Sequence, residues 1–204
     1  MSEITPSQTV GPFFAYGLTP KGRCEWDPNG SYSWKNTVES NLVTPDASGT
    51  RIRIEGIVYD GDNLPINDCM IEIWQADAQG RYASPRDNRP LPNTQFKGFG
   101  RSATDKAGVF AFDTIKPGQV AGPGGKPQAP HIVVCIFSRG MIRQVYTRLY
   151  FDDEPANAAD PILSMVPAER RATLIAHKQA GTDPVLYRFD IRVQGGDETV
   201  FFDI

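Results

Sequence analysis

The stretch Ile52–Tyr82, IRIEGIVYDGDNLPINDCMIEIWQADAQGRY, decides the fold of this chain. Two runs in it, Ile52–Tyr59 and Met70–Trp74, largely alternate apolar and polar residues, which predicts β-strands with one buried face. The residues between them include Asp60–Asn63, DGDN, which is typical of a turn. The second run leads into a Gly80-Arg81-Tyr82 corner, so the stretch predicts a tyrosine presented close to the end of a strand.

Outside this stretch, seventeen prolines and nineteen glycines separate short apolar runs. Such punctuation is typical of an all-β protein, and we expect a β-sandwich with long loops. A hairpin turn is predicted at Thr104–Gly108 and a long loop at Pro117–Pro130, because both segments are rich in turn residues. Further strands are predicted at Gly108–Phe112, Ile132–Phe137, Val145–Phe151 and Tyr187–Val193.

One short C-terminal helix is predicted over Pro167–Lys178, where proline and an acid open the segment, basic residues close it and Gly181 follows. In that helix His177 would be a cation near the C-terminus. Residues 1–50 have little periodicity and are expected to form an arm that wraps the core or a partner chain. Residues 51–204 are expected to form the sandwich.

Composition excludes several functional classes. A net charge of −3, with 21 basic and 24 acidic residues, argues against binding to nucleic acid or to a membrane surface. Cys24, Cys69 and Cys135 are odd in number and lack C-x-x-C spacing, which fits a reducing compartment. Neither a signal peptide nor an apolar run of membrane-spanning length is evident. We therefore expect a soluble, cytoplasmic protein.

A second feature is a histidine that lacks a metal-binding neighbour. Residues two apart on a strand share one face, so a His-x-His pair can hold a metal ion together. Here His131 is followed two residues later by Val133, which offers no lone pair. The other histidine of the chain, His177, lies far along the sequence. A tyrosine becomes a ligand only where a strongly charged metal displaces its proton.

These motifs resemble the signature of the intradiol ring-cleavage dioxygenases, β-sandwich enzymes that hold ferric iron between two tyrosines and two histidines. In that family the ligands come from the G-R-Y corner, a P-G-x-Y segment and a P-A-H-x-H strand. The corresponding segments here are Pro117–Val120, PGQV, and Ala129–Val133, APHIV. The resemblance implies four relict ligand positions and no metal bound by this chain: Tyr82, Val120, His131 and Val133.

Both ends of the chain narrow the resemblance. Thr5–Pro12, TPSQTVGP, and Asp197–Asp203, DETVFFD, are similar to the termini of the alpha chains of protocatechuate 3,4-dioxygenases. That resemblance implies a hetero-oligomer in which a beta chain of related fold binds Fe(3+). Protocatechuate and O2 would give 3-carboxy-cis,cis-muconate in a pocket that both chains share. This chain would hold no catalytic residue and would lend four substrate-binding residues: Thr9, Gly11, Pro12 and Arg139.

Each of these residues has a plainer interpretation. Arg139 suits the ring carboxylate of the substrate, since a guanidinium offers a fixed fork of donors, but it could equally form a surface ion pair at a strand end. Tyr82 and His131 could be hydrogen-bonded residues at the edge of an empty pocket.

Arg148 corresponds to a position near the iron in beta chains and could fill the metal position. Asp77 or Glu72 would then be its partner.

Two other functions remain open for the whole chain. One is a structural β-sandwich subunit with no part in an active site, and the other is a self-sufficient metalloenzyme with unusual ligands. The apolar tail Val200–Phe202 is expected in the core or at an interface, and we favour the interface.

Overall fold

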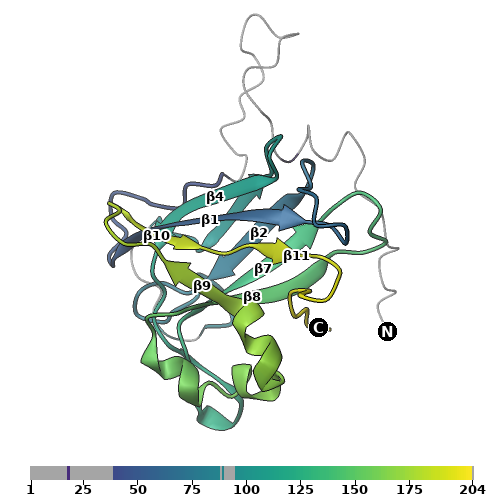
Figure 1. The fold of residues 1–204 in the computed structure, drawn as a ribbon. Coiled ribbons are helices and arrows are strands. Elements are labelled where there is room, and N and C mark those ends of the chain that lie inside the picture. Colours follow the sequence, from purple (N-terminus) through teal and green to yellow (C-terminus); the bar gives the residue numbers. More distant parts are fainter. Residues whose placement is uncertain (1–17, 19–38, 88, 90–94, 204) are drawn as a thin grey trace, which may run out of the picture.

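A computed structural model of the chain describes residues 18, 39–87, 89 and 95–203 (Figure 1). Thr9, Gly11, Pro12 and most of the expected arm lie outside these described residues. The principal strands are β1 (Arg51–Tyr59), β2 (Met70–Gln75), β3 (Phe99–Ala103), β4 (Val109–Ile115), β7 (His131–Phe137), β8 (Val145–Phe151), β9 (Ile175–Lys178), β10 (Val185–Arg188) and β11 (Ile191–Arg192). A small hairpin consists of β5 (Val120–Ala121) and β6 (Pro127–Gln128).

The helical segments of the described chain are short 3-10 turns. They are η2 (Pro123–Gly125), η3 (Pro155–Ala159), η4 (Leu163–Met165) and η5 (Ala168–Leu174). In Figure 1 the coiled segments after β8 gather in a lobe at one end of the strands. The expectation of an all-β sandwich is confirmed.

The strands form one sheet that folds over into two halves. Its order is β11-β1-β10-β9-β8-β7-β2-β3, and β4 pairs with the other side of β1. β9 joins the halves, because it pairs with β8 of one half and with β10 of the other. It is parallel to β8 and antiparallel to β10. The strands β1 and β2, which follow one another in the deciding stretch, therefore lie in different halves. Their inward faces build a common core.

The core follows from the alternation that predicted the strands. Along β1 every second residue is buried, including Ile52, Ile54 and Val58. β7 and β8 contribute Ile132, Val134, Ile136, Leu149 and Phe151 to the same cluster. A second, smaller cluster joins the lobe to the strands and consists of Ala129, Tyr150, Leu163, Val166 and Leu174. Apolar burial on this scale is the main stabilising term of the fold.

The helix predicted over Pro167–Lys178 is wrong in its second half. The 3-10 turn η5 ends at Leu174, and the next four residues form β9. Ile175 pairs with Tyr150 of β8 and His177 pairs with Arg188 of β10. Strand pairing with both halves therefore overrides the local helical preference, which is a weak determinant. His177 lies on a strand, with Nδ1 3.3 Å from Asp152 Oδ2.

Two other segments differ in detail from the prediction. The strand expected at Tyr187–Val193 is broken at Phe189-Asp190, where the Asp190 carboxylate accepts a hydrogen bond of 2.9 Å from the Ile57 backbone N–H. The loop expected at Pro117–Pro130 contains the β5–β6 hairpin. The Thr104–Gly108 turn is present, but it joins β3, which pairs with β2, to β4, which pairs with β1. It therefore crosses between the halves.

The C-terminal tail packs on its own chain, which agrees with the core alternative, and the favoured interface stays a prediction. Phe202 forms a bridge with Tyr146, and its N–H donates to the Tyr146 carbonyl oxygen at 2.8 Å. Thr147 Oγ1 donates to the Val200 carbonyl oxygen at 2.7 Å. The ring of Phe201 lies against the main core. Two half-buried aromatic rings can gain their burial from the sandwich itself.

Residues 39–42 lie between two edge strands of the sheet. The Arg101 N–H of β3 donates to Glu39 O at 3.1 Å, and the Asp113 N–H of β4 donates to Ser40 O at 3.0 Å. The Leu42 N–H returns a bond of 2.8 Å to Asp113 O. The Leu42 side chain is buried in the main core. This four-residue segment, the edge segment, ties β3 to β4.

Candidate functional site

The corner after β2 is built around Asp77. One carboxylate oxygen accepts the N–H groups of Gln79 and Arg81 at 2.9 Å each, and the other accepts Arg81 Nε at 3.1 Å. The Asp77 carbonyl oxygen accepts the N–H of Gly80 at 3.0 Å and that of Gly118 at 2.9 Å. Asp77 therefore holds the Tyr82 corner beside the Gly118–Val120 segment.

Gly80 is required at this corner for two reasons. Its φ is +71°, which disfavours residues with a side chain. A Cβ atom there would also lie 1.8 Å from the Gln119 carbonyl oxygen. The close approach of the two segments places Tyr82 and Val120 on the walls of the same pocket.

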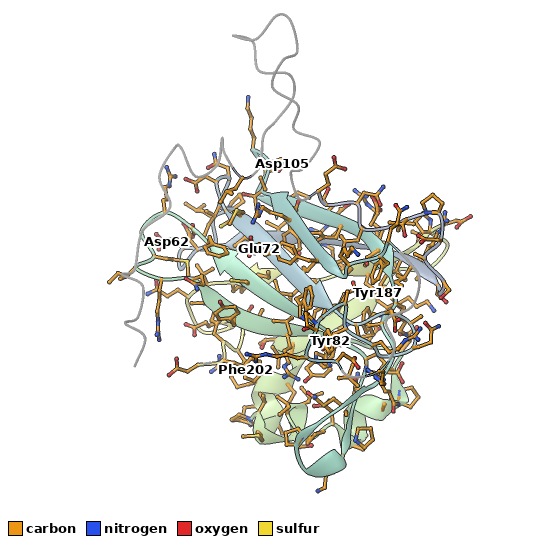
Figure 2. The ribbon with its side chains drawn as sticks, turned by 180° about the vertical axis from the view of Figure 1, so that it is seen from behind. Asp62, Glu72, Tyr82, Asp105, Tyr187 and Phe202 are labelled. Carbon is orange, nitrogen blue, oxygen red and sulfur yellow. The ribbon has the colours of Figure 1, made fainter. Side chains whose placement is uncertain are left out.

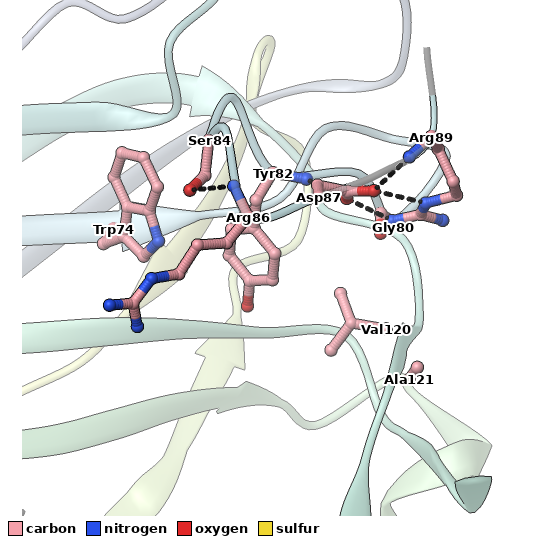
Figure 3. A pocket seen from close by; sticks show the side chains of 9 residues that line it. All are labelled: Trp74, Gly80, Tyr82, Ser84, Arg86, Asp87, Arg89, Val120 and Ala121. Carbon is pink, nitrogen blue, oxygen red and sulfur yellow. Dashed lines mark hydrogen bonds and ion pairs between the residues drawn. The ribbon is translucent and has the colours of Figure 1, made fainter. Parts of the chain in front are cut away.

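That pocket has a volume of about 540 Å³ (Figure 3). Tyr82 stacks on Trp74 with ring centres 5.9 Å apart and ring planes 10° from parallel. On the opposite rim, Arg89 donates to both carboxylate oxygens of Asp87, from Nη2 at 2.6 Å and Nε at 2.8 Å. This pairing holds the pKa of Asp87 well below its usual range. The lining residues are Trp74, Gly80, Tyr82, Ser84, Arg86, Asp87, Arg89, Val120 and Ala121.

Two of the four relict positions keep a donor atom. Burial raises the pKa of Tyr82, although the positive charge of Arg148 acts in the opposite direction. Figure 2 places Tyr82 close to the end of the molecule that carries the lobe. His131 is buried, and its Nδ1–H donates to the Ala129 carbonyl oxygen at 2.8 Å. Burial, followed by the charge of Arg148, lowers the pKa of His131 to about 4, so the ring is neutral.

The other two positions carry alkyl groups. Val120 is buried on β5, and Val133 lies on β7 between Trp74 of β2 and Arg148 of β8. Ferric iron in this arrangement would lack two of four side-chain ligands, and the positive charge of Arg148 acts on the remaining two. The residues present therefore do not fit the ion. Within the described part of the chain, no group of three or more His, Cys, Asp or Glu residues could hold a metal.

Arg148 lies at this site, but its partners are not those expected. Its Nη1 donates to Gln128 Oε1 at 2.7 Å and approaches the Tyr150 hydroxyl at 3.4 Å. Asp77 instead pairs with Arg81, and Glu72 with Arg101 at 2.5 Å. The hydrogen bond between Arg148 and Gln128 could not be found from the sequence, because the two residues are far apart in the chain and only the fold brings them together.

Arg139 lies at the other end of β7, about 20 Å along the strand from His131. Its side chain is 72% exposed, and Nε forms an ion pair of 3.0 Å with Asp68 Oδ2. The structure thus places Arg139 apart from the Tyr82 pocket, on the surface where β7 turns back into β8. In this chain alone it forms the surface ion pair that the plainer interpretation expects.

Sequence reasoning missed Gln128 and Asp160. Asp160 is fully buried and accepts the backbone N–H groups of Ala129, Ile162 and Leu163 at 2.7–2.9 Å, together with the Tyr150 hydroxyl at 3.2 Å. An aspartate directly before a proline, here between the turns η3 and η4, is the local signal that could have suggested a capping role.

Comparison with known proteins identifies the family. A dioxygenase family model matches residues 28–195. Over 98% of its length, the chain is 46% identical to the protocatechuate 3,4-dioxygenase alpha chain of Burkholderia cepacia and 44% identical to that of Pseudomonas putida, and it spans 97% and 96% of those proteins. The chain belongs to the intradiol dioxygenase family.

Other intradiol dioxygenases are more distant. The protocatechuate 3,4-dioxygenase beta chain of Burkholderia cepacia is 34% identical over 81% of this chain and 72% of its own length. The crystal structure of 3-chlorocatechol 1,2-dioxygenase from Rhodococcus opacus 1CP superposes with a TM-score of 0.60 at 23% identity, covering 74% of this chain and 62% of that one. At that identity the superposition establishes the shared fold alone. The described residues contain no helix long and apolar enough to cross a membrane.

Proposed function

We propose that this chain is the alpha subunit of a protocatechuate 3,4-dioxygenase and pairs with an iron-binding beta subunit. The observation that carries the proposal is the near-full-length identity of 46% to an alpha chain, together with alkyl groups at two of the four ligand positions. A beta chain from the same organism as that relative also matches this chain, as expected for two subunits of related fold.

The proposed contribution of this chain is to substrate binding. Arg139 would meet the ring carboxylate of protocatechuate in the partner's pocket, and Thr9, Gly11 and Pro12 would line the same pocket. The exposure of Arg139 supports this role, because most of its side chain remains on the surface while Asp68 orients its Nε. The iron, where bound by the partner, would supply the metal chemistry of ring opening.

A second candidate is a structural subunit that takes no part in the active site. The ion pair between Arg139 and Asp68 favours it, because that pair gives the arginine a function within its own chain. The two candidates differ in whether loss of Arg139 alters the handling of substrate.

Co-expression with a beta-type chain tests the proposal. We expect the purified complex to contain about one ferric ion per pair of chains and to show the colour of tyrosinate bound to iron, since this chain lacks a complete ligand set. The chain purified alone should be colourless. Colour and iron in the isolated chain would contradict the proposal and favour the self-sufficient metalloenzyme. Ring cleavage that does not require this chain would also contradict it.

A further inference from the structure

The guanidinium of Arg148 stands among the four relict positions. In the β7–β8 register, Arg148 is the direct partner of Val133. In the β5–β6 register, Val120 is the direct partner of Gln128, whose Oε1 accepts a hydrogen bond of 2.7 Å from Arg148 Nη1. Val133 therefore lies directly opposite the donor of this hydrogen bond, and Val120 lies directly opposite its acceptor.

The two positions that keep a donor are also coupled to Arg148. Its Nη1 lies 3.4 Å from the hydroxyl of Tyr150, whose ring lies 5.8 Å from that of His131. Its charge lowers the proton affinity of both Tyr82 and His131. The Phe202 ring, 5.9 Å from the guanidinium carbon, lies over the same group.

A buried carboxylate balances the charge of Arg148 through one intervening side chain. Arg148 is in none of the ion pairs found among the described residues. The Tyr150 hydroxyl, however, lies between it and Asp160, donating to Asp160 Oδ1 at 3.2 Å. Three backbone N–H groups hold Asp160 in place. A fixed anion behind Tyr150 therefore faces a fixed cation in front of it.

We propose that Arg148 is a built-in cation that takes the place of the metal ion in this chain and excludes a metal from the four relict positions. A guanidinium is charged at all physiological pH values, and a second cation brought beside it in a partly desolvated site would be repelled. Loss of two ligands and gain of an arginine are then two separate barriers to metal binding. The proposal rests on family membership and on these contacts, not on a substrate contact by Arg139.

Restoring the ligands with and without the arginine separates the two barriers. The variants are Val120→Tyr/Val133→His and the same pair with Arg148→Gln or Arg148→Lys, each full-length chain co-expressed with its beta-type partner. We expect iron beyond the wild-type amount only in the variant with Arg148→Gln, approaching about one extra ion per chain, because only that variant has a complete donor set without the cation. Equal iron contents with and without Arg148→Gln would overturn the proposal.

Single substitutions keep the proposal testable if the multiple variants fail to fold. Arg148→Gln should lower the melting temperature of the complex by several degrees, since it leaves Asp160 without a nearby cation. Arg148→Lys keeps a cation and should lower the melting temperature less. Arg51→Gln is the matched control, because Arg51 is the exposed first residue of β1 and should have almost no effect. If the Arg148→Gln complex melts at the same temperature as the wild-type complex, the cation does not maintain this site and the proposal fails.

Discussion

At the scale of single residues, Arg139 carries the sharpest expectation. Arg139→Ala should lower kcat/KM for protocatechuate about ten- to a hundred-fold, because a charge-assisted hydrogen bond to the ring carboxylate is worth about 1.5–3 kcal/mol. The loss should shrink on catechol, which has both hydroxyl groups and no carboxylate. Steady-state kinetics of the complex on both substrates measures the effect, and the iron content should be unchanged.

Arg143→Ala provides the control, since Arg143 lies in the same loop, is similarly exposed and forms an ion pair with Asp203. Equal losses on the two substrates after Arg139→Ala would assign Arg139 to the interface. Unchanged rates on both would remove it from the substrate pocket and favour the structural subunit.

Residue identity predicted part of the site. The absence of a lone pair on Val120 and Val133 is a property of the side chains, so the sequence alone predicted that a metal would not fit. The position of Arg148 followed from the motif, but its hydrogen bond to Gln128 did not, because Gln128 is 20 residues away in a segment predicted as a loop. Hydrogen bonding across such a separation depends on how the segments pair in the fold, which local sequence does not specify.

At the scale of elements, Asp153 connects the ends of four strands. It follows β8 and accepts Lys116 Nζ at 2.8 Å, Lys178 Nζ at 3.0 Å and the Tyr187 hydroxyl at 3.0 Å, from residues at or after β4, β9 and β10. Burial alone would raise the pKa of Asp153, but these hydrogen bonds outweigh it and lower the pKa to about 2. The charged carboxylate therefore links the two halves of the sheet, and we call these three hydrogen bonds the Asp153 clasp.

This depressed pKa predicts the acid range in which the clasp fails. A carboxyl group whose folded pKa lies below its unfolded value of about 3.9 stabilises the fold above that value. Its contribution falls as the pH drops from about 4 through 2. Asp153→Asn should thus lower the melting temperature at neutral pH and flatten its dependence on pH in this range. Thermal melts at several pH values compare it with Asp203→Asn, an exposed control, and equal slopes for the two variants would contradict the assignment.

Strand prediction succeeded for runs rich in β-branched and aromatic residues. The predicted limits of β1 and β2 are each within one residue of the structure, and those of β8 agree. β9 was missed because its basic residues and the following Gly181 are also signals of a helix end, and it becomes a strand by pairing on both sides. The break between β10 and β11 was missed because Phe189 continues the apolar pattern.

At the scale of the whole molecule, the two ends of β7 differ in what they expose. The turn after β7 carries Ile142, which is 78% exposed, close in sequence to Arg139. The lobe, at the other end, carries Met165, which is 79% exposed. If Arg139 reaches into the partner's pocket, the Ile142 end should be buried against the partner chain.

Ile142→Glu should therefore weaken association with the beta-type chain about ten-fold or more, as expected for a charge forced into an apolar contact. Met165→Glu, a substitution at a similarly exposed residue in the lobe, should change it less than about two-fold. Sedimentation of the mixed chains over a range of concentrations measures both. A larger effect from Met165 than from Ile142 would place the partner on the lobe.

The edge segment, residues 39–42, has a consequence for how this protein avoids fibrous aggregation. β3 and β4 are edge strands of the sheet, and an uncovered edge strand is a template on which a further strand from another molecule can add. Glu39, Ser40 and Leu42 already use backbone groups of both strands. Strand addition at Arg101 of β3 and Asp113 of β4 is thereby opposed by the chain itself. Growth of an assembly is then left to side-chain contacts, which can close on a defined number of copies.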